Sequence, residues 1–442
     1  MKRSAYIEFE SYLRDFDYRF LLALDLANKG VDVFFGFVYY FNKFSTFGPL
    51  GSLYYAKDCT PEKLNDIRTR KSRGFKNIVL DEEANSVYQM TPKYLNYRYN
   101  KFTIDYIDYS IFGTRYEFEK VTLKYNCDKK SIKCMNPRFT LYKDFDLYKK
   151  SSEKVKKKYG SFILFPLSGS LEHVLGYEGR QKEIEGINIL LEKHMDKSLN
   201  NDDFFDQYIA YEQMNIKLLN LIPFVAREFP NIKFVIRVHP SDTNKNPESF
   251  LKDHPKNVIF DRSGNITPYI LASDFIIHTN CTSGFDAFCA GKETINFVDK
   301  EIKIPEEYSD CISQSFGHQV NDLSSLKNAI KLILKSKNND NKLIYNRKND
   351  EIFSHGNNFS YLADFLYRVH SENIENGNQT YAEKLRTFLY QSWARFKLLK
   401  RQDSILNHVN TLLPNIDKKY HENIDISLVH DGVVRIEQKR KN

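Results

Sequence analysis

The chain has 442 residues, which is more than one ordinary hydrophobic core supports and predicts two domains. Hydrophobic residues make up 41% of the sequence and charged residues 28%, a balance that excludes an intrinsically disordered chain. The formal net charge of +8 favours an anionic ligand or an anionic membrane surface. Nucleic acid is disfavoured, because the basic residues are scattered and no nucleic-acid-binding module is recognisable.

Cysteine usage and hydropathy predict where the protein resides. The six cysteines show no C-x-x-C spacing, and the N-terminus lacks the apolar run of a secretion signal. No stretch approaches the roughly 18 apolar residues that a membrane-spanning helix needs. We therefore expect a reduced, cytoplasmic setting. Any membrane contact is expected to be peripheral, on the cytoplasmic face of the inner membrane.

The first third of the chain alternates between strand and helix patterns. One helix pattern places Phe20 and Leu24 on the same face before Gly30 ends it. Alternation of this kind predicts a parallel sheet covered by helices. The strands are expected at residues 4–9, 31–38, 77–80 and 109–112, and the helices at residues 17–28 and 61–73. The Lys-rich residues 142–160 are expected to form a solvated helix that connects two domains.

A second alternating segment follows, in which Pro230 ends a long helix pattern. Its strands are expected at residues 161–166, 233–238, 257–260, 274–278 and 294–297, and its helices at residues 205–229, 266–272 and from residue 285 onward. The remainder is expected to be mostly helical. The sequence therefore predicts an α/β protein of GT-B architecture, with two Rossmann-like domains facing a central cleft and a helical C-terminal extension. The domains are expected at residues 1–158, 159–322 and 323–442, with the last packing back on the first.

Two strand ends of the second domain carry residues suited to a phosphate group. Arg237 and His239 share a face of their strand, so both could reach one phosphate, and Pro240 stiffens the exit. The alternative is a plain strand end with a partly exposed histidine. The first strand of this domain runs into Ser168 and Gly169, where a small-residue loop could let the backbone approach a nucleotide or could form a simple turn.

A strand-to-helix turn of small residues offers a further phosphate site in the same domain. Unpaired amides and the helix dipole point outward at such a turn, and hydroxyl groups add donors. Small hydroxyl residues are also ordinary helix caps. An acidic residue in the first turns of the helix could bind ribose hydroxyls or simply complement the dipole. The residues concerned are Thr279, Asn280, Thr282, Ser283, Gly284 and the acidic Asp286.

Several segments resemble the surface carbohydrate (surface polysaccharide) biosynthesis family of GT-B proteins. Residues 14–23 resemble its opening helix, and residues 136–139 resemble its G-N-P-R-F segment. Residues 79–84 resemble its acidic D-E-E-G motif, although Ala84 replaces the glycine. The Arg-x-His-Pro strand end and the T-S-G turn are similar to those of sialyltransferases, Kdo transferases and CDP-glycerol phosphotransferases.

The resemblance implies a glycosyltransferase that takes a sugar from a CMP-activated donor. It is expected to be metal-independent, because neither Asp-x-Asp segment, residues 15–17 or 144–146, lies at a strand end suited to the donor phosphate, and no His/Cys cluster has ligand spacing. The sugar would be a nonulosonate such as Kdo or a sialic-acid-like sugar, and the lipid-linked or oligosaccharide acceptor would belong to a bacterial surface glycan such as lipopolysaccharide or capsule. No cofactor and no metal site are expected. The residues expected to act in catalysis, on the acceptor hydroxyl or on the leaving phosphate, are Asp81, Glu82, Glu83, Asp17 and His239.

Other functions fit the same residues. A CDP-polyol phosphotransferase would use the same cytidine phosphate site, and a UDP-hexose transferase or a non-catalytic glycan-assembly protein would share the fold. Residues 385–401 combine bulky apolar and basic side chains at helical spacing. This segment is expected either to pack against the first domain or to rest on an anionic membrane.

Overall fold

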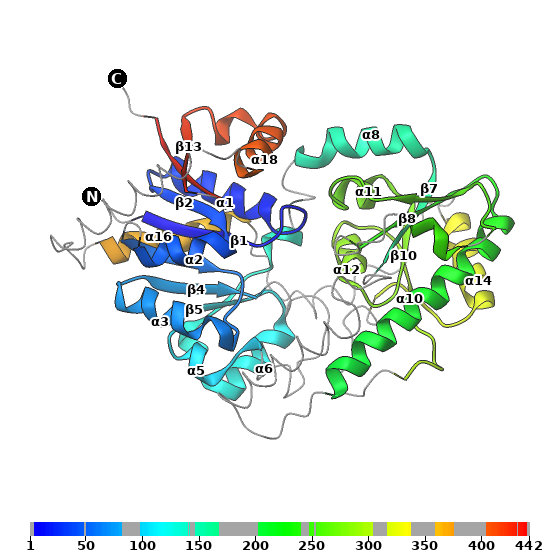
Figure 1. Ribbon diagram of the computed structural model, residues 1–442, viewed down its shortest axis with the longest axis horizontal. Helices are drawn as coiled ribbons and strands as arrows, with labels where there is room; N and C mark the ends of the chain where they lie inside the picture. Colours follow the sequence, from blue (N-terminus) through cyan, green and yellow to red (C-terminus); the bar gives the residue numbers. More distant parts are fainter. Residues whose placement is uncertain are drawn as a thin grey trace. The chain divides into compact units, whose positions relative to one another are not determined.

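The computed structural model describes residues 4–47, 50–81, 98–139, 141, 146–167, 202–239, 247–251, 253–303, 316–336, 359–374, 404–430 and 432–439. The chain forms two compact units (Figure 1). Unit 1 contains residues 1–85, 94–147 and 353–442, and unit 2 contains residues 86–93 and 148–352. The units thus divide the chain near residues 147 and 352, whereas the predicted domains ended at residues 158 and 322.

Unit 1 is built on a sheet of eight strands in the order β13-β14-β2-β1-β3-β4-β5-β6. Strands β1 to β6 pair in parallel, whereas β14 pairs antiparallel with both β2 and β13. The strands are β1 (Ser4–Phe9), β2 (Val33–Phe37), β3 (Gly51–Ala56), β4 (Lys76–Leu80), β5 (Tyr109–Phe112), β6 (Ser131–Lys133), β13 (Ile424–His430) and β14 (Val433–Gln438). The prediction of a mostly helical C-terminal region did not include β13 and β14.

The helices of unit 1 pack on this sheet, and two of them come from the last part of the chain. Helix α16 packs against β3 and α1, and α2 packs against α3. The helices are α1 (Phe16–Asn28), α2 (Val38–Phe47), α3 (Leu64–Ser72), α5 (Lys101–Ile104), α6 (Arg115–Tyr125), α16 (Phe359–Ile374) and α18 (Ser404–Leu412). Because the C-terminal segments supply an edge hairpin and two helices, they are part of the core of unit 1.

Unit 2 is built on a parallel sheet of six strands in the order β12-β11-β10-β7-β8-β9. The strands are β7 (Phe162–Pro166), β8 (Lys233–Arg237), β9 (Val258–Asp261), β10 (Phe275–His278), β11 (Thr294–Phe297) and β12 (His318–Val320). The helices are α8 (Lys149–Tyr159), α10 (Asp202–Glu228), α11 (Thr267–Ala272), α12 (Thr282–Cys289) and α14 (Leu323–Ser336).

Both faces of the unit 2 sheet are covered, as its apolar strands require. Phe162 and Leu164 of β7 join a core formed with α8, α11 and α12. The alternate residues, Ile163 and Phe165, join a second core formed with α10 and α14. Successive side chains of a strand point to opposite faces, so an unbroken apolar run fills both layers.

Each sheet has one point where the chain reverses the direction in which it adds strands. In unit 2 the strands β8 and β9 lie on one side of β7, and β10, β11 and β12 lie on the other. In unit 1, β2 lies on one side of β1, and β3 to β6 lie on the other. Open parallel sheets bind ligands at such switch points, beyond the carboxyl ends of the strands. Ligand sites are therefore expected at the carboxyl ends of β7 and β10, and of β1 and β3.

Candidate functional site

The predicted turn of unit 2 lies at its switch point. Strand β10 ends at His278, and α12 begins at Thr282, so residues 279–281 form a tight connection at the carboxyl edge of the sheet. We call residues 279–284 the anion-binding turn, after the role that the sequence predicts for them. His239 follows β8, which lies two strands from β10 and therefore about 10 Å away across the sheet.

Side chains from neighbouring elements hold the anion-binding turn in shape. Asn280 adopts a left-handed backbone conformation with φ of 47°, which asparagine enters more readily than most residues other than glycine. Its backbone N–H donates to Oδ1 of Asn296 at 2.8 Å, and Nδ2 of Asn296 donates to Oδ1 of Asn280 at 2.7 Å. The hydroxyl of Thr279 donates to Oδ1 of Asn215 at 2.9 Å. The polar groups of Thr279 and Asn280 therefore build the turn.

The N-terminus of α12 is suited to an anion. Its N-cap residue is Cys281, whose side chain makes no capping hydrogen bond, and its first turn contains no acidic residue. Thr282 and Ser283 are the first two residues of the helix, and both are half-buried. Unpaired amides and the positive end of the helix dipole attract negative charge. Asp286 lies inside α12 and is buried, and its predicted contact with ribose stays a prediction.

Gly284 allows α12 to start directly against the end of β10. A Cβ atom at this position would lie 2.4 Å from both Cε1 and Nε2 of His278. The His278 ring is fully buried, and burial lowers the pKa of His278 to about 3, so the ring is neutral. A larger residue at position 284 would push the helix away from the strand end and carry the helix amides with it.

Arg237 is held by groups of unit 2. Its guanidinium donates to the carbonyl oxygens of Ser263 at 2.9 Å and Gly264 at 2.7 Å, and it pairs with Asp261 at 3.4 Å. It also stacks over the ring of Tyr269 at 4.2 Å. These contacts fix the end of β8, from which the half-buried His239 follows.

Three further predicted residues of this site, Ser168, Gly169 and Pro240, lie outside the described residues. The predicted phosphate contacts of Arg237 and His239 stay predictions.

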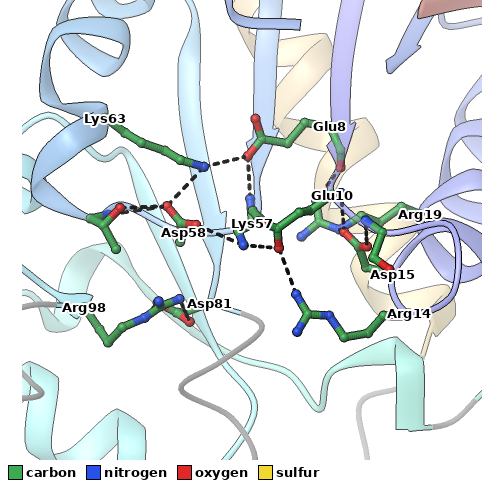
Figure 2. A network of polar contacts seen from close by, with 12 residues as sticks. Glu8, Glu10, Arg14, Asp15, Arg19, Lys57, Asp58, Lys63, Asp81 and Arg98 are labelled. Carbon is green, nitrogen blue, oxygen red and sulfur yellow. Dashed lines mark hydrogen bonds and ion pairs between the residues drawn. The ribbon is translucent and has the colours of Figure 1, made fainter. Parts of the chain in front are cut away.

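A network of charged residues lies beyond the carboxyl ends of β1, β3 and β4 in unit 1 (Figure 2). Asp81 forms two hydrogen bonds with the Arg98 guanidinium, at 2.8 and 2.6 Å, and its side chain is fully buried. Both carboxylate oxygens are therefore engaged, which is unfavourable for a general base. The neighbouring predicted residues, Glu82 and Glu83, lie outside the described residues.

Glu10 is an exposed carboxylate of this network that the sequence analysis missed. It follows β1, its side chain is 40% exposed, and it pairs with Arg14 at 2.8 Å and with Lys57. Lys57 also lies 3.5 Å from Asp58. Burial alone would raise the pKa of Asp58, but neighbouring cations, led by Lys63, hold it below its ordinary value. The charges at this switch point are thus mutually balanced, with Glu10 facing solvent.

A second contact joins the predicted Asp17 to the last part of the chain. Asp17 lies in the first turn of α1, and its Oδ1 is 3.8 Å from Nε2 of His408 on α18. The His408 side chain is 30% exposed and its ring lies 5.0 Å from that of Tyr12. An imidazole beside a buried carboxylate can accept a proton. His408 is 391 residues from Asp17, and nothing in the sequence links the two.

Two features are absent from the described residues. No group of three or more His, Cys, Asp or Glu side chains is placed to hold a metal ion. Within the same residues, no helix is long and apolar enough to cross a membrane. The predicted amphipathic segment, residues 385–401, lies outside this part of the chain.

Comparisons with known proteins support the fold. No protein-family model and no curated protein sequence matches the chain. A solved structure of the wall teichoic acid polymerase TagF has a TM-score of 0.52 at 12% identity, and the match covers 85% of this chain and 90% of that one. A structure of the same polymerase soaked with CDPG has a TM-score of 0.50 at 12% identity, with 84% and 90% covered.

UDP-GlcNAc 2-epimerase from Methanocaldococcus jannaschii has a TM-score of 0.46 at 10% identity, with 83% of this chain and all of that chain covered. The polymerase structures, together with the two largely parallel sheets, carry the assignment of the fold. The chain therefore has an α/β fold of the GT-B class, as its sequence predicted.

Proposed function

We propose that this chain is a glycosyltransferase that takes a sugar from a cytidine-nucleotide donor and adds it to a bacterial surface glycan. The donor would be a CMP-activated nonulosonate such as Kdo or a sialic-acid-like sugar, and the acceptor a lipid-linked or free oligosaccharide. One observation carries the proposal. The N-terminus of α12, whose N-cap side chain makes no capping hydrogen bond, lies at the switch point of unit 2.

The donor phosphate would bind at the anion-binding turn. As the bond between the anomeric carbon and the phosphate oxygen breaks, the bonding electrons pass to the leaving phosphate. The amides of α12 and the hydroxyls of Thr282 and Ser283 would stabilise this charge, because they are held in place before the reaction begins. His239 would add a further hydrogen bond. Arg237 would act by fixing the end of β8.

The acceptor hydroxyl must lose a proton while its oxygen forms the new bond to the anomeric carbon. Unit 1 would supply the base. The pair of His408 and Asp17 fits this role best, because an imidazole can take a proton and the carboxylate, 3.8 Å away, can stabilise the resulting imidazolium. Asp81 is committed to Arg98. Glu82 and Glu83 stay alternative bases.

A CDP-polyol phosphotransferase is the second candidate function. It is favoured by the matched structures of a wall teichoic acid polymerase, one of them soaked with CDPG. It would use the same phosphate site, but the acceptor oxygen would attack phosphorus. Both reactions release CMP, so the new linkage distinguishes them: mass spectrometry of the product shows a glycosidic bond or a phosphodiester.

A thermal-shift experiment tests the nucleotide site. CMP should raise the melting temperature more than UMP or GMP, because a ligand that binds only the folded state stabilises it, by about 2.7 kcal/mol at 100 times Kd. Replacing both Thr282 and Ser283 with alanine should reduce the CMP shift. The matched control replaces Ser151 and Ser152, two helical hydroxyls of α8 that bond only to nearby carbonyls.

The control should keep the full CMP shift. If CMP produced no shift, or if the double variant responded as the control does, the cytidine site proposed here would be wrong. A larger shift with UMP would favour the UDP-hexose alternative.

A further inference from the structure

Helix α8 is fixed to unit 2 along one side. Tyr159 is buried in the core that the helix shares with α11, which lies below it in Figure 1. Two ion pairs hold its flanks, one between Lys156 and Asp274 at 3.3 Å and one between Lys158 and Asp261 at 3.0 Å. These contacts determine which side of the helix faces solvent.

The solvent side of α8 carries an excess of positive charge. We call its four exposed lysines, Lys149, Lys150, Lys154 and Lys157, the lysine row. None of the four forms an ion pair within the described part of the chain. Glu153 is the one acidic residue of the helix, so it offsets a single positive charge of the row.

The lysine row is unfavourable for the helix itself. Lys149 and Lys150 lie in the first turn, where the helix dipole repels positive charge and where this helix has no acidic residue. Lys154 is four residues after Lys150 and three before Lys157, and like charges at these spacings repel. Glu153, four residues from Lys149 and from Lys157, offsets part of this repulsion. Solubility alone does not require such a row, because lysines interspersed with acidic residues also keep a surface soluble. An anionic partner explains better why the helix keeps charges that destabilise it.

We propose that α8 docks on an anionic lipid surface through the lysine row. The row covers eight residue steps, or about 12 Å, along a convex helix. A small phosphate ligand needs donors that converge in a concavity, which this row does not provide. A plane of lipid phosphates matches it, and each lysine near such a surface adds to the attraction. Recognition of RNA would add arginine or aromatic side chains, and the row has neither.

Vesicle sedimentation with the full chain tests this proposal independently of the nucleotide site. The vesicles contain phosphatidylcholine alone or with about 30% phosphatidylglycerol. The wild type should pellet only with the anionic vesicles, and high salt should release it. Replacing the four lysines of the row with glutamine should weaken the partition at least about tenfold. Glutamine keeps a good helix propensity, and circular dichroism and melting temperature verify folding.

A matched variant controls for net charge. It replaces four exposed lysines elsewhere in unit 2, Lys256, Lys300, Lys303 and Lys335, with glutamine. This variant should bind the anionic vesicles within about twofold of the wild type, and Lys-to-Arg changes in the row should also preserve binding. The proposal is overturned if both glutamine variants lose binding equally, if the wild type binds neutral vesicles as well, or if it binds single-stranded RNA and not vesicles.

Discussion

Glu117 is a buried carboxyl whose protonation is coupled to folding. It lies in the first turn of α6 with 1% of its surface exposed, and burial raises its pKa from 4.5 to about 8. Its Oε1 accepts a hydrogen bond from the Tyr99 hydroxyl, and its Oε2 accepts one from the backbone N–H of Gly113 at 3.2 Å. These bonds oppose the rise but do not cancel it. Folding of unit 1 therefore takes up a proton near neutral pH.

This coupling predicts how stability changes with pH. Below pH 4.5 the carboxyl is protonated in both states, and its contribution is fully present. As pH rises to about 8, the unfolded chain gives up the proton that the folded chain keeps, so the free energy of unfolding falls by up to about 1.4 kcal/mol per pH unit. Urea titrations at about pH 5.5 and 7.5 should show a loss about 2 kcal/mol smaller in Glu117→Gln than in the wild type.

The same helix supplies the control for this experiment. Glu119 is more than half exposed, and its one ion pair among the described residues is with Arg115, so Glu119→Gln should keep the pH dependence of the wild type. Equal pH dependence in Glu117→Gln and the wild type would show that Glu117 is ionised in the folded chain at neutral pH.

The elements that the sequence predicts are those with a strong local pattern. The strands Tyr109–Phe112 and Thr294–Phe297 have the predicted bounds, because each is a short apolar run between turn residues. Strand β3 was missed. It begins with Gly51 and Ser52, which disfavour a strand locally. A Cβ atom at residue 51 would lie only 2.0 Å from Cε1 of Phe75, so the Phe75 ring leaves room for glycine alone. Tertiary packing therefore requires the residue that weakens the local signal.

The edge hairpin β13–β14 shows a second reason for a missed element. The apolar residues Ile424, Ile426 and Leu428 alternate along β13, which pairs with β14. Strand β14 in turn pairs with β2, which lies nearly 400 residues earlier in the chain. Arg435 of β14 forms two hydrogen bonds with Asp32, at 2.8 and 2.9 Å. The hairpin itself is local, and Asp431-Gly432 between two alternating apolar runs is a hairpin signal that the prediction of a helical C-terminal region overlooked. Only the pairing of β14 with β2 is long-range and leaves no mark in a local sequence window.

The hairpin should be required for the stability of unit 1. Val433, Val434 and Ile436 are fully buried, and each contributes roughly 1.5 to 3 kcal/mol, so their sum approaches the whole stability of an ordinary domain. A chain ending at Asn423 would also expose the edge of β2. We expect it to be largely insoluble, whereas a chain ending at Lys439 should unfold in urea at the wild-type midpoint. Comparable midpoints for both truncations would show that the hairpin is dispensable.

At the scale of the whole molecule, the chain leaves unit 1, forms unit 2 and returns to complete unit 1. This path explains which parts of the candidate sites were predictable. The anion-binding turn is contiguous in sequence, so Thr282, Ser283 and Gly284 could be identified from the strand before them and the helix after them. The Asp17–His408 contact and the Asn280–Asn296 pair join different elements, and only the folded chain brings them together.

Because each unit has its own sheet and core, CMP should stabilise one of them selectively. A nucleotide at the anion-binding turn should slow amide hydrogen exchange in β10 and α12 and in the adjoining strands of unit 2, since exchange there requires opening that the ligand opposes. Strands β1 to β6 of unit 1 should exchange at unchanged rates. Mass spectrometry of peptides from the full chain, with and without CMP, measures both units in one sample. Slower exchange confined to unit 1 would place the nucleotide on the wrong sheet for the proposed mechanism. Equal slowing of exchange in both units would mean that the two units open together.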